Sequence, residues 1–349
     1  MRTALSEQDC SALSALATTF LEQFKAPGLS VAIARQGRLI YQEGFGFADV
    51  EKREKLTPQH AFRIASVSKP ITSSGIFSLI EQGKLQLQDC VFGPKGLLGS
   101  AYGMPPSDAL SAITVHHLLT HTCGGWGNAK RDPMFLHPTM SHQELIAWTL
   151  KNIPLEHTPG THHDYSNFGY CLLGRIIEKA SGLPYAEAVQ QHVLKKCGIE
   201  SMRIAGNTVA ERAEHEVLYY GQNKENPYSM NIRRMDAHGG WLGTPTDLVK
   251  FVLRVDGFDT PTDILRADTL KTMTTPSRVH ANYACGWVVN KEQNWWHNGS
   301  IPGVMTILLR TASGLCWAAF ANTRATGISK GIDELMWKMV RAVPIRSDR

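Results

Sequence analysis

The sequence has no long apolar run, no cysteine-pair motif and no strong excess of charge of either sign. A membrane-spanning helix needs about 18 or more consecutive apolar residues, and since no such run occurs we expect no membrane span. The 36 basic and 31 acidic residues leave a formal charge of only +5. No basic run carries interleaved aromatic residues, so a nucleic-acid partner is not expected either. A content of 43% hydrophobic and 19% charged residues over 349 positions excludes disordered and fibrous classes and predicts a soluble globular chain.

The seven cysteines are odd in number and form no Cys-x-x-Cys motif. Such a scatter is typical of reduced thiols in a cytosolic protein and not of a disulfide framework. The first 25 residues contain Glu7, Asp9 and Glu22 and no continuous apolar segment, so they do not resemble a secretory signal. The sequence therefore predicts a cytoplasmic location.

Short apolar runs typical of strands lie at the two ends of the chain, and helical patterns fill its middle. The strand-like runs cover 28–34, 38–45, 284–289, 303–309 and 315–321, and the internal helical patterns cover 70–82, 142–152, 168–181, 185–195 and 246–255. Strands and helices do not alternate, which argues against a doubly wound parallel sheet. We therefore predict an α+β fold in which residues 1–60 and 275–349 form one antiparallel sheet flanked by terminal helices. Residues 61–274 would form a large, mainly helical insertion, with the active-site cleft between the two parts.

The first candidate for chemistry is Ser66-Val67-Ser68-Lys69, followed by Pro70 and a helical pattern. Residues i and i+3 lie on the same face of a helix, so we expect Lys69 to lie near the Ser66 hydroxyl. A lysine whose pKa is lowered by burial can accept the serine proton and activate the hydroxyl as a nucleophile. The alternative is an ordinary helix N-cap beside a solvated lysine, and a Ser-x-x-Lys motif alone does not separate the two.

Two further short motifs carry polar side chains. Tyr165 and Asn167 precede a helical pattern, where Tyr165 could pass a proton to a leaving group and Asn167 could hydrogen-bond Lys69 and a substrate carbonyl. His297-Asn298-Gly299-Ser300 lies at a candidate strand, where a glycine lets a substrate approach the backbone and the next N–H can serve an oxyanion hole. Taken singly, the motif at 165–167 is equally compatible with an ordinary helix cap, and the motif at 297–300 is equally compatible with a turn.

These three motifs, in this order and at these separations, resemble the serine β-lactamase-like superfamily, whose signatures include Ser-x-x-Lys. The likeness is closest to the branch that contains class C β-lactamases, D,D-peptidases, D-aminopeptidases and family VIII-type esterases. In that branch the second motif is Tyr-x-Asn and the third is Lys/His-x-Gly. The stretches 62–65, 117–122, 159–160 and 239–251 also resemble it, so that the likeness covers most of the chain.

The resemblance implies a five-stranded antiparallel sheet beside a helical domain. It implies that Ser66 is acylated, that Lys69 and Tyr165 share the general base and acid work, and that the N–H groups of Ser66 and Ser300 form the oxyanion hole. It implies no metal and no organic cofactor. The expected partner is a small-molecule ester, amide or β-lactam.

His297 departs from the lysine that β-lactamases usually carry in the third motif. A lysine is a fixed cation that helps to hold a substrate carboxylate, whereas a histidine is mostly neutral at pH 7. The difference favours an esterase- or amidase-like hydrolase over a dedicated β-lactamase. The side chains expected to contact the substrate come from the motifs, from one long loop and from the end of the last strand: Asn167, His297, Asn298, Gly299, Trp126 and Arg324.

Rival interpretations come from other motifs and from other members of the same branch. The stretch 327–331 matches the nucleophile elbow of α/β-hydrolases, but that fold needs a histidine after the serine, and none follows Ser329. His117 and His121 could ligate a metal, but the glutamate of a His-Glu-x-x-His motif is absent. A D-amino-acid peptidase or amidase stays open, as does a penicillin-binding protein that is acylated without rapid turnover.

Overall fold

In the computed structural model, which describes residues 5–103, 107–222 and 224–343, strands from both ends of the chain form one antiparallel sheet. Its strands are β1 (Gly28–Arg35), β2 (Arg38–Asp49), β3 (Glu54–Lys55), β7 (Val288–Val289), β8 (Trp295–Ile301), β9 (Val304–Arg310) and β10 (Leu315–Ala321). Their spatial order is β3-β2-β1-β10-β9-β8-β7, so that the first and last strands of the chain pair at β1 and β10. A small second sheet has the order β4 (Phe62–Arg63), β6 (Trp241–Gly243), β5 (Arg203–Ile204).

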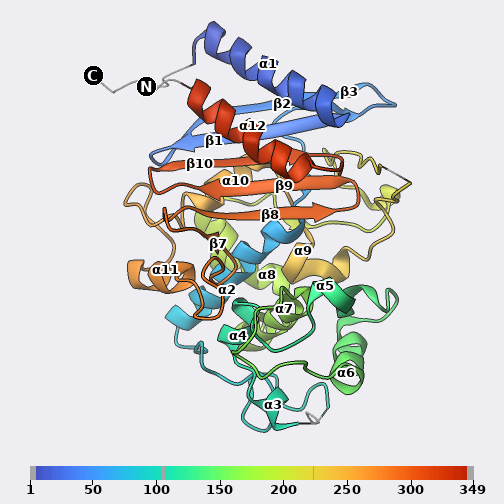
Figure 1. Ribbon diagram of the computed structural model, residues 1–349, viewed down its shortest axis with the longest axis vertical. Coiled ribbons are helices and arrows are strands. Elements are labelled where there is room, and N and C mark those ends of the chain that lie inside the picture. Colours follow the sequence, from blue (N-terminus) through green and yellow to red (C-terminus); the bar gives the residue numbers. More distant parts are fainter. Residues whose placement is uncertain (1–4, 104–106, 223, 344–349) are drawn as a thin grey trace.

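The sheet separates two hydrophobic cores, because successive side chains of a strand point to opposite faces. On one face, Leu29, Val31 and Ile33 of β1 pack with the helices α1 (Glu7–Phe24) and α12 (Ile328–Ala342). Figure 1 shows these two helices crossing in front of the strands. On the other face, Ala32 and Ala34 belong to the larger core that the internal helices complete. Small side chains there allow α10 (Pro245–Val252) to contact β1 and β10 directly.

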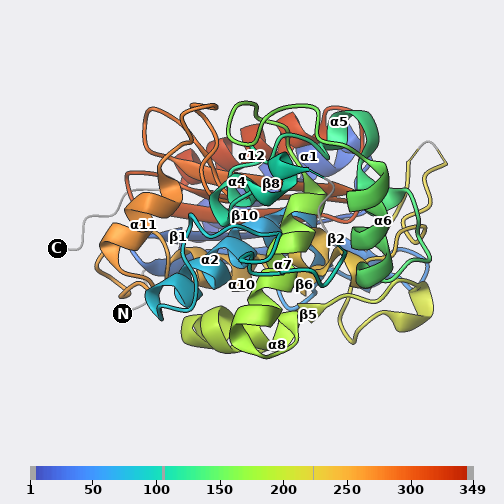
Figure 2. The ribbon, with the colours of Figure 1, turned by 90° about the horizontal axis from the view of Figure 1, so that it is seen from below.

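The helical part lies below the sheet in Figure 1 and is seen end-on in Figure 2. Two long helices, α2 and α7, contact each other at its centre. The remaining helices surround this pair or connect it to the sheet. The internal helices are α2 (Ser68–Glu81), α3 (Asp108–Ser111), α4 (Val115–Leu119), α5 (Asn128–Arg131), α6 (His142–Asn152), α7 (Asn167–Ser181), α8 (Tyr185–Val189), α9 (Asp236–Gly239), α10 and α11 (Ala267–Thr274).

The expected α+β architecture is present, but the expectation of a five-stranded sheet is wrong, since the main sheet has seven strands among the described residues. The two additional strands are the two-residue edge strands β3 and β7, which pair with the end of β2 and with Trp295–Trp296 of β8. Two residues are too few to show a strand periodicity. Of the apolar run 284–289, only Val288 and Val289 are a strand, and the pattern at 185–195 divides into α8, a π-helical turn and the start of a 3-10 turn.

All seven cysteines are free thiols, and five of them are buried. Among the described residues, no helix combines the length and the apolar character needed to cross a bilayer.

Candidate active site

Ser66 lies on a tight 3-10 turn (Ala65–Val67) that runs directly into α2, and not inside the helix itself. Ala65 has a φ of 49°, a conformation that side-chain-bearing residues rarely adopt. Strand β8 lies directly against this turn, because a β-carbon on Gly299 would come within 2.3 Å of the Ile64 carbonyl oxygen. Gly299 is thus required for the contact between β8 and the Ser66 turn. Within this buried turn, Ser66 alone is partly exposed, and it lines the main cavity.

Lys69, one turn into α2, is completely buried, and its ammonium nitrogen has three oxygen neighbours. Nζ lies 2.7 Å from Asn167 Oδ1, 3.1 Å from the His238 carbonyl oxygen and 3.2 Å from Ser66 Oγ. Burial lowers the pKa of Lys69 to about 7, although the Asp132 carboxylate acts in the opposite direction. A neutral amine has two hydrogens and one lone pair. The amide and carbonyl oxygens can only accept, so they take the two hydrogens, and the lone pair is left facing the Ser66 hydroxyl.

Asn167, the first residue of α7, has the orientation of its carboxamide fixed by Asp132. Its Nδ2 donates to Asp132 Oδ2 at 2.7 Å, which turns Oδ1 toward Lys69. The second oxygen of Asp132 accepts the backbone N–H of Met134 at 2.9 Å. Burial raises the pKa of Asp132. Sequence reasoning did not single out this residue, because nothing in the loop around it distinguishes a structural aspartate from a functional one.

Tyr165 precedes α7, and its ring lies beside Lys69, with Nζ 4.7 Å from the ring centroid. Burial raises the pKa of its hydroxyl far above the ordinary range, while an interaction with the Ser66 side chain works in the opposite direction. The phenol is therefore protonated at neutral pH and can give a proton to a group bound near Ser66. Ser66, Lys69, Tyr165 and Asn167, predicted from two separate motifs, thus lie together.

His297 on β8 is buried and neutral, and both of its ring nitrogens are engaged within the protein. Nδ1 lies 2.8 Å from the Asn298 carbonyl oxygen, and Nε2 lies 3.2 Å from the Tyr283 hydroxyl. Burial, with the charge of Lys69 as a second cause, lowers the pKa of His297 to about 3. The side chain is consequently neutral at neutral pH and presents no cation to the cavity there.

The backbone N–H groups of Ser66 and Ser300 belong to two elements, the Ser66 turn and β8, that contact each other at Gly299. The two-residue turn at Pro302 and Gly303 makes Ile301 and Val304 the first hydrogen-bonded pair of the β8–β9 hairpin. Since hydrogen-bonded and non-hydrogen-bonded pairs alternate, the N–H of Ser300 points away from β9. The N–H of Ser66 lies ahead of the first hydrogen bond of its turn, from Val67 to Ile64, at a helix start where N–H groups lack helical acceptors.

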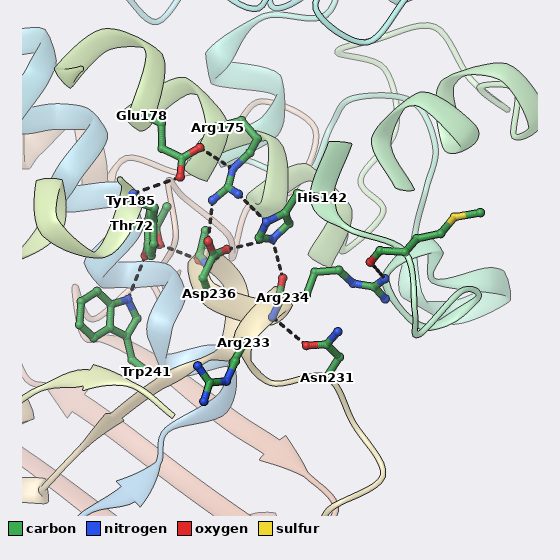
Figure 3. A network of polar contacts seen from close by, with 12 residues as sticks. Thr72, His142, Arg175, Glu178, Tyr185, Asn231, Arg233, Arg234, Asp236 and Trp241 are labelled. Carbon is green, nitrogen blue, oxygen red and sulfur yellow. Dashed lines mark hydrogen bonds and ion pairs between the residues drawn. The ribbon is translucent and has the colours of Figure 1, made fainter. Parts of the chain in front are cut away.

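A buried polar network lies behind the site, around Arg175 and Asp236 (Figure 3). Arg175 of α7 pairs with Asp236 at the start of α9, and His142 lies between Arg175 and the Arg234 carbonyl. Burial opposes ionisation of Asp236, but Arg175 and His142 hold the pKa of this carboxyl below its usual value. Thr72 adds a hydrogen bond of 2.6 Å to the Ala237 carbonyl. The network therefore anchors the short helix α9, whose His238 carbonyl contacts Lys69.

The cavity in front of Ser66 has a volume of about 720 Å³ and is bordered by both the sheet and the helical part. Its apolar lining comes from Phe135, Met230, Met235, Trp296, Ile301 and Met305, among others. No Asp or Glu occurs among the lining residues that the structure describes, and Arg324 is the one arginine or lysine there. Arg324 is paired with Glu225, which lies outside the lining.

The remaining predicted site residues are distributed unevenly around this cavity. Asn298 and Ser300 line it, and so does Ser329, whose hydroxyl accepts a long hydrogen bond from Asn298. Trp126, which we expected to contact substrate, is instead a core residue. Its ring packs against Phe168 and its Nε1 donates to the Ile153 carbonyl at 3.0 Å.

Within the described part of the chain, no group of three or more His, Cys, Asp or Glu side chains is arranged to hold a metal ion.

The chain is similar in sequence and fold to several known proteins. The chain is 27% identical over 308 residues to Penicillin-binding protein 4* of Bacillus subtilis (strain 168), a match that covers 80% of this chain and 64% of the relative. The chain thus spans less than two thirds of the length of that curated relative. Among solved structures it is similar to SurE with D-Leu, with a TM-score of 0.75, 26% identity and coverage of 97% of this chain and 76% of the other.

A second solved structure shows the same fold at lower identity. D-amino acid amidase from Ochrobactrum anthropi SV3, complexed with L-phenylalanine amide, superposes with a TM-score of 0.78 at 21% identity and covers 97% of this chain and 99% of the other. The beta-lactamase family model matches residues 13–336. With its fold, its three motifs and this match over most of its length, the chain belongs to the beta-lactamase family of serine hydrolases.

Proposed function

We propose that this protein hydrolyses carboxylic esters or amides through an acyl-enzyme on Ser66. The observation that carries the proposal is the environment of Lys69, which leaves one lone pair facing the Ser66 hydroxyl at 3.2 Å and a pKa of about 7. A base is most effective when its pKa lies near the working pH. A solvated first-turn lysine would have neither property.

In the acylation step, Ser66 Oγ attacks the substrate carbonyl carbon and its proton moves to Lys69 Nζ. The carbonyl oxygen becomes negatively charged and accepts hydrogen bonds from the N–H groups of Ser66 and Ser300, which serve as the oxyanion hole. When the carbon–leaving-group bond breaks, the Tyr165 hydroxyl supplies the proton that the leaving group needs, and Lys69 returns a proton to Tyr165. In deacylation a water molecule replaces the leaving group and the same proton transfers run in reverse.

The cavity favours substrates whose acyl part is uncharged. Its lining is largely apolar, and flexible methionine side chains such as Met230 and Met235 can adapt to different acyl shapes. Arg324, the one lining cation, already has Glu225 as its counter-ion. A free carboxylate on the substrate would therefore find no unpaired cation near Ser66, because His297 is neutral.

A second candidate is the hydrolysis of D-amino-acid amides or peptides, suggested by the names of SurE with D-Leu and of D-amino acid amidase. An α-ammonium group would have no carboxylate among the described lining residues to pair with, which makes this the weaker candidate.

A third candidate is a penicillin-binding protein that is acylated without rapid turnover, since the geometry supports acylation more directly than deacylation.

One assay panel separates these candidates. Purified protein is tested with p-nitrophenyl esters of increasing chain length, nitrocefin and D-amino-acid amides, and the pre-steady-state burst is recorded. Ester turnover well beyond one product per protein supports the proposal. Preference for D-amino-acid amides would favour the second candidate, and a burst of about one product that then stops would favour the third.

A further inference from the structure

A chain of side-chain hydrogen bonds links the second motif to the third across the site. It begins at the backbone N–H of Ser166, which donates to His121 Nδ1 at 3.1 Å. His121 Nε2 lies 3.0 Å from the Tyr283 hydroxyl, and that hydroxyl lies 3.2 Å from His297 Nε2. The chain ends where His297 Nδ1 meets the Asn298 carbonyl at 2.8 Å. His121 and Tyr283 belong to none of the three motifs.

The two ends of this chain fix the tautomers of its two neutral histidines. A backbone N–H only donates, so His121 Nδ1 accepts, and the neutral ring carries its proton on Nε2. A carbonyl oxygen only accepts, so His297 carries its proton on Nδ1 and its Nε2 must accept. The Tyr283 oxygen accepts from His121, and the Tyr283 hydrogen is the one available to His297 Nε2, although the Tyr170 oxygen, whose own hydroxyl donates to the Leu119 carbonyl at 2.9 Å, is a second acceptor for it.

Both imidazoles are kept neutral by their surroundings. Burial lowers the pKa of His121 and of His297 well below the ordinary value, and the charge of Lys69 acts in the same direction on both. The titratable groups that face the two rings from neighbouring elements are Lys69 on α2, His163 and Tyr165 before α7, Tyr170 on α7 and Tyr283. None of these groups is a carboxylate, so among the described residues facing the two rings there is no anion that would stabilise a protonated form.

The same three side chains enclose the ring of Tyr165. The ring centroid of His121 lies 4.3 Å from that of Tyr165, and the centroids of Tyr283 and His297 each lie 6.1 Å from it. A phenol must be held in one orientation if its hydroxyl is to reach a leaving group, because a small misplacement of a reacting group is costly to the rate.

We propose that Tyr283 is a positioning residue. It contacts Nε2 of His297, whose Nδ1–H tautomer is set by the Asn298 carbonyl, and, with His121, it holds the Tyr165 ring in the orientation in which its hydroxyl meets Ser66. His297 then acts as a spacer with both nitrogens occupied, and not as a receptor for a substrate carboxylate. The part of the proposal that concerns Tyr165 rests on the proposed function, whereas the tautomer assignment does not.

The tautomers can be read directly from the wild-type protein. In long-range ¹H–¹⁵N spectra of protein labelled at the histidine ring nitrogens, we expect His297 to be neutral with its proton on Nδ1 and His121 to be neutral with its proton on Nε2, from pH 6 to 8. An Nε2–H tautomer or a protonated ring at His297 would overturn the proposal. This measurement holds even if a variant fails to fold.

The kinetic test uses Tyr283→Phe, which removes the hydroxyl and keeps the ring, with Tyr219→Phe as the matched control. Tyr219 is a buried tyrosine whose hydroxyl is also hydrogen-bonded on both sides, but outside the cavity lining. Loss of one buried hydrogen-bonding partner predicts a fall in kcat of about tenfold or more with KM nearly unchanged. The pKa of His297 should rise, because the hydrogen bond that favoured its neutral form is gone, and the acid limb of kcat should gain a second ionisation.

Failure of this proposal can be distinguished from failure of the proposed function. If Tyr283→Phe retains wild-type kcat and pH profile while Ser66 is still labelled by a fluorophosphonate, Tyr283 has no positioning role and the hydrolase proposal stands. If the wild type is not labelled at Ser66, the hydrolase proposal fails, and the tautomer measurement decides whether the hydrogen-bond chain exists.

Discussion

At the scale of single residues, burial decides which side chains of the site carry charge. Lys69, Tyr165 and His297 are all enclosed, and burial moves each pKa toward the neutral form, downward for the amine and the imidazole and upward for the phenol. Slightly above pH 7 the group of side chains around Ser66 is then almost uncharged. These side chains are therefore suited to passing protons to one another and not to binding a charged substrate.

The most direct consequence concerns the nucleophile. Ser66→Ala should abolish turnover and labelling by a fluorophosphonate, because the attacking oxygen is removed while the turn is retained. Intact-protein mass spectrometry measures the labelling. Ser329→Ala is the control, since Ser329 also lines the cavity but has no lysine or tyrosine beside it in the described contacts. Stoichiometric labelling of Ser66→Ala, with none in Ser329→Ala, would reverse the assignment.

The pKa of Lys69 predicts the pH dependence. Only the neutral amine can take the Ser66 proton, so kcat/KM should rise with pH and level off above a midpoint near 7. Asp132 raises this pKa, so Asp132→Asn should move the midpoint to lower pH. A pH profile of wild type and variant on one ester measures the shift. A midpoint that moves upward, or an acid limb that persists in Lys69→Met, would contradict the role of Lys69.

Tyr165→Phe tests the proton donor. The chemical step should slow by about 10²-fold on an amide, whose leaving group must be protonated, as is usual when a general acid is removed. A p-nitrophenyl ester of the same acid is the internal control, because its leaving group departs without a proton and should be much less affected. Equal effects on both substrates would mean that Tyr165 has another role, and a near-wild-type rate on the amide would exclude it as the donor.

The sequence alone could predict the motif residues but not the residues that orient them. Ser66 and Lys69 are three positions apart, and such a local relation can be read from a helix pattern. Asp132 acts on Asn167 from 35 positions away, and Tyr283 acts on His121 from 162 positions away. No spacing rule relates positions so distant, and only the fold brings them together. Trp126 shows the converse error, because an aromatic residue in a long loop can equally be a core residue.

At the scale of elements, the long periodic segments were predictable and the short ones were not. The patterns at 142–152 and 168–181 match α6 and α7 closely, because each has a buried apolar stripe and a serine cap. Helix α11 was missed, since it lies among polar residues with only three of its eight residues buried. The four-residue α9 has no periodicity to detect, yet its position sets one contact of Lys69. Its geometry is imposed by Arg175 and Thr72, which are distant in sequence.

This dependence predicts an element-scale effect of Asp236→Ala. The substitution leaves Arg175 with the partly exposed Glu178 as its carboxylate partner, and breaking a buried ion pair typically costs about 3–5 kcal/mol of stability. Urea unfolding measures the loss, and kcat should fall as well, because the His238 carbonyl loses its fixed position on Lys69. Glu334→Gln is the control, since Lys330 and Glu334 form an exposed pair on α12, and it should leave the unfolding midpoint nearly unchanged. Equal stability of the two variants would show that the network does not anchor α9.

At the scale of the whole molecule, the fold places the free edge of β8 opposite the start of α2. Strand β3 is the edge strand at one end of the sheet. At the other end the edge strand β7 pairs only with Trp295 and Trp296 of β8. The rest of β8, from His297 onward, is not paired with β7, so that the outward N–H of Ser300 faces away from the sheet while the Asn298 carbonyl is bound by His297 Nδ1. The antiparallel pairing of β1 with β10 makes this possible, because it brings the two ends of the chain together and leaves the third motif beside the first.

The charge distribution around this cavity predicts substrate preference for the protein as a whole. With His297 neutral and Arg324 paired to Glu225, uncharged esters such as p-nitrophenyl butyrate should be better substrates than the anionic β-lactam nitrocefin. Glu225→Gln keeps the size of the side chain but removes its charge, so Arg324 becomes free to bind a carboxylate. A charge-assisted hydrogen bond is worth about 1.5–3 kcal/mol, so the ratio of kcat/KM for nitrocefin to that for the ester should rise by about tenfold or more.

Both substrates are measured at one pH above 7, where Lys69 is neutral. In the double variant with Arg324→Gln the gain should disappear, because the cation that binds the carboxylate is then absent. A wild type that already prefers nitrocefin, with a ratio unmoved by either substitution, would mean that the backbone edge of β8 and not the Arg324–Glu225 pair determines how the protein treats anions.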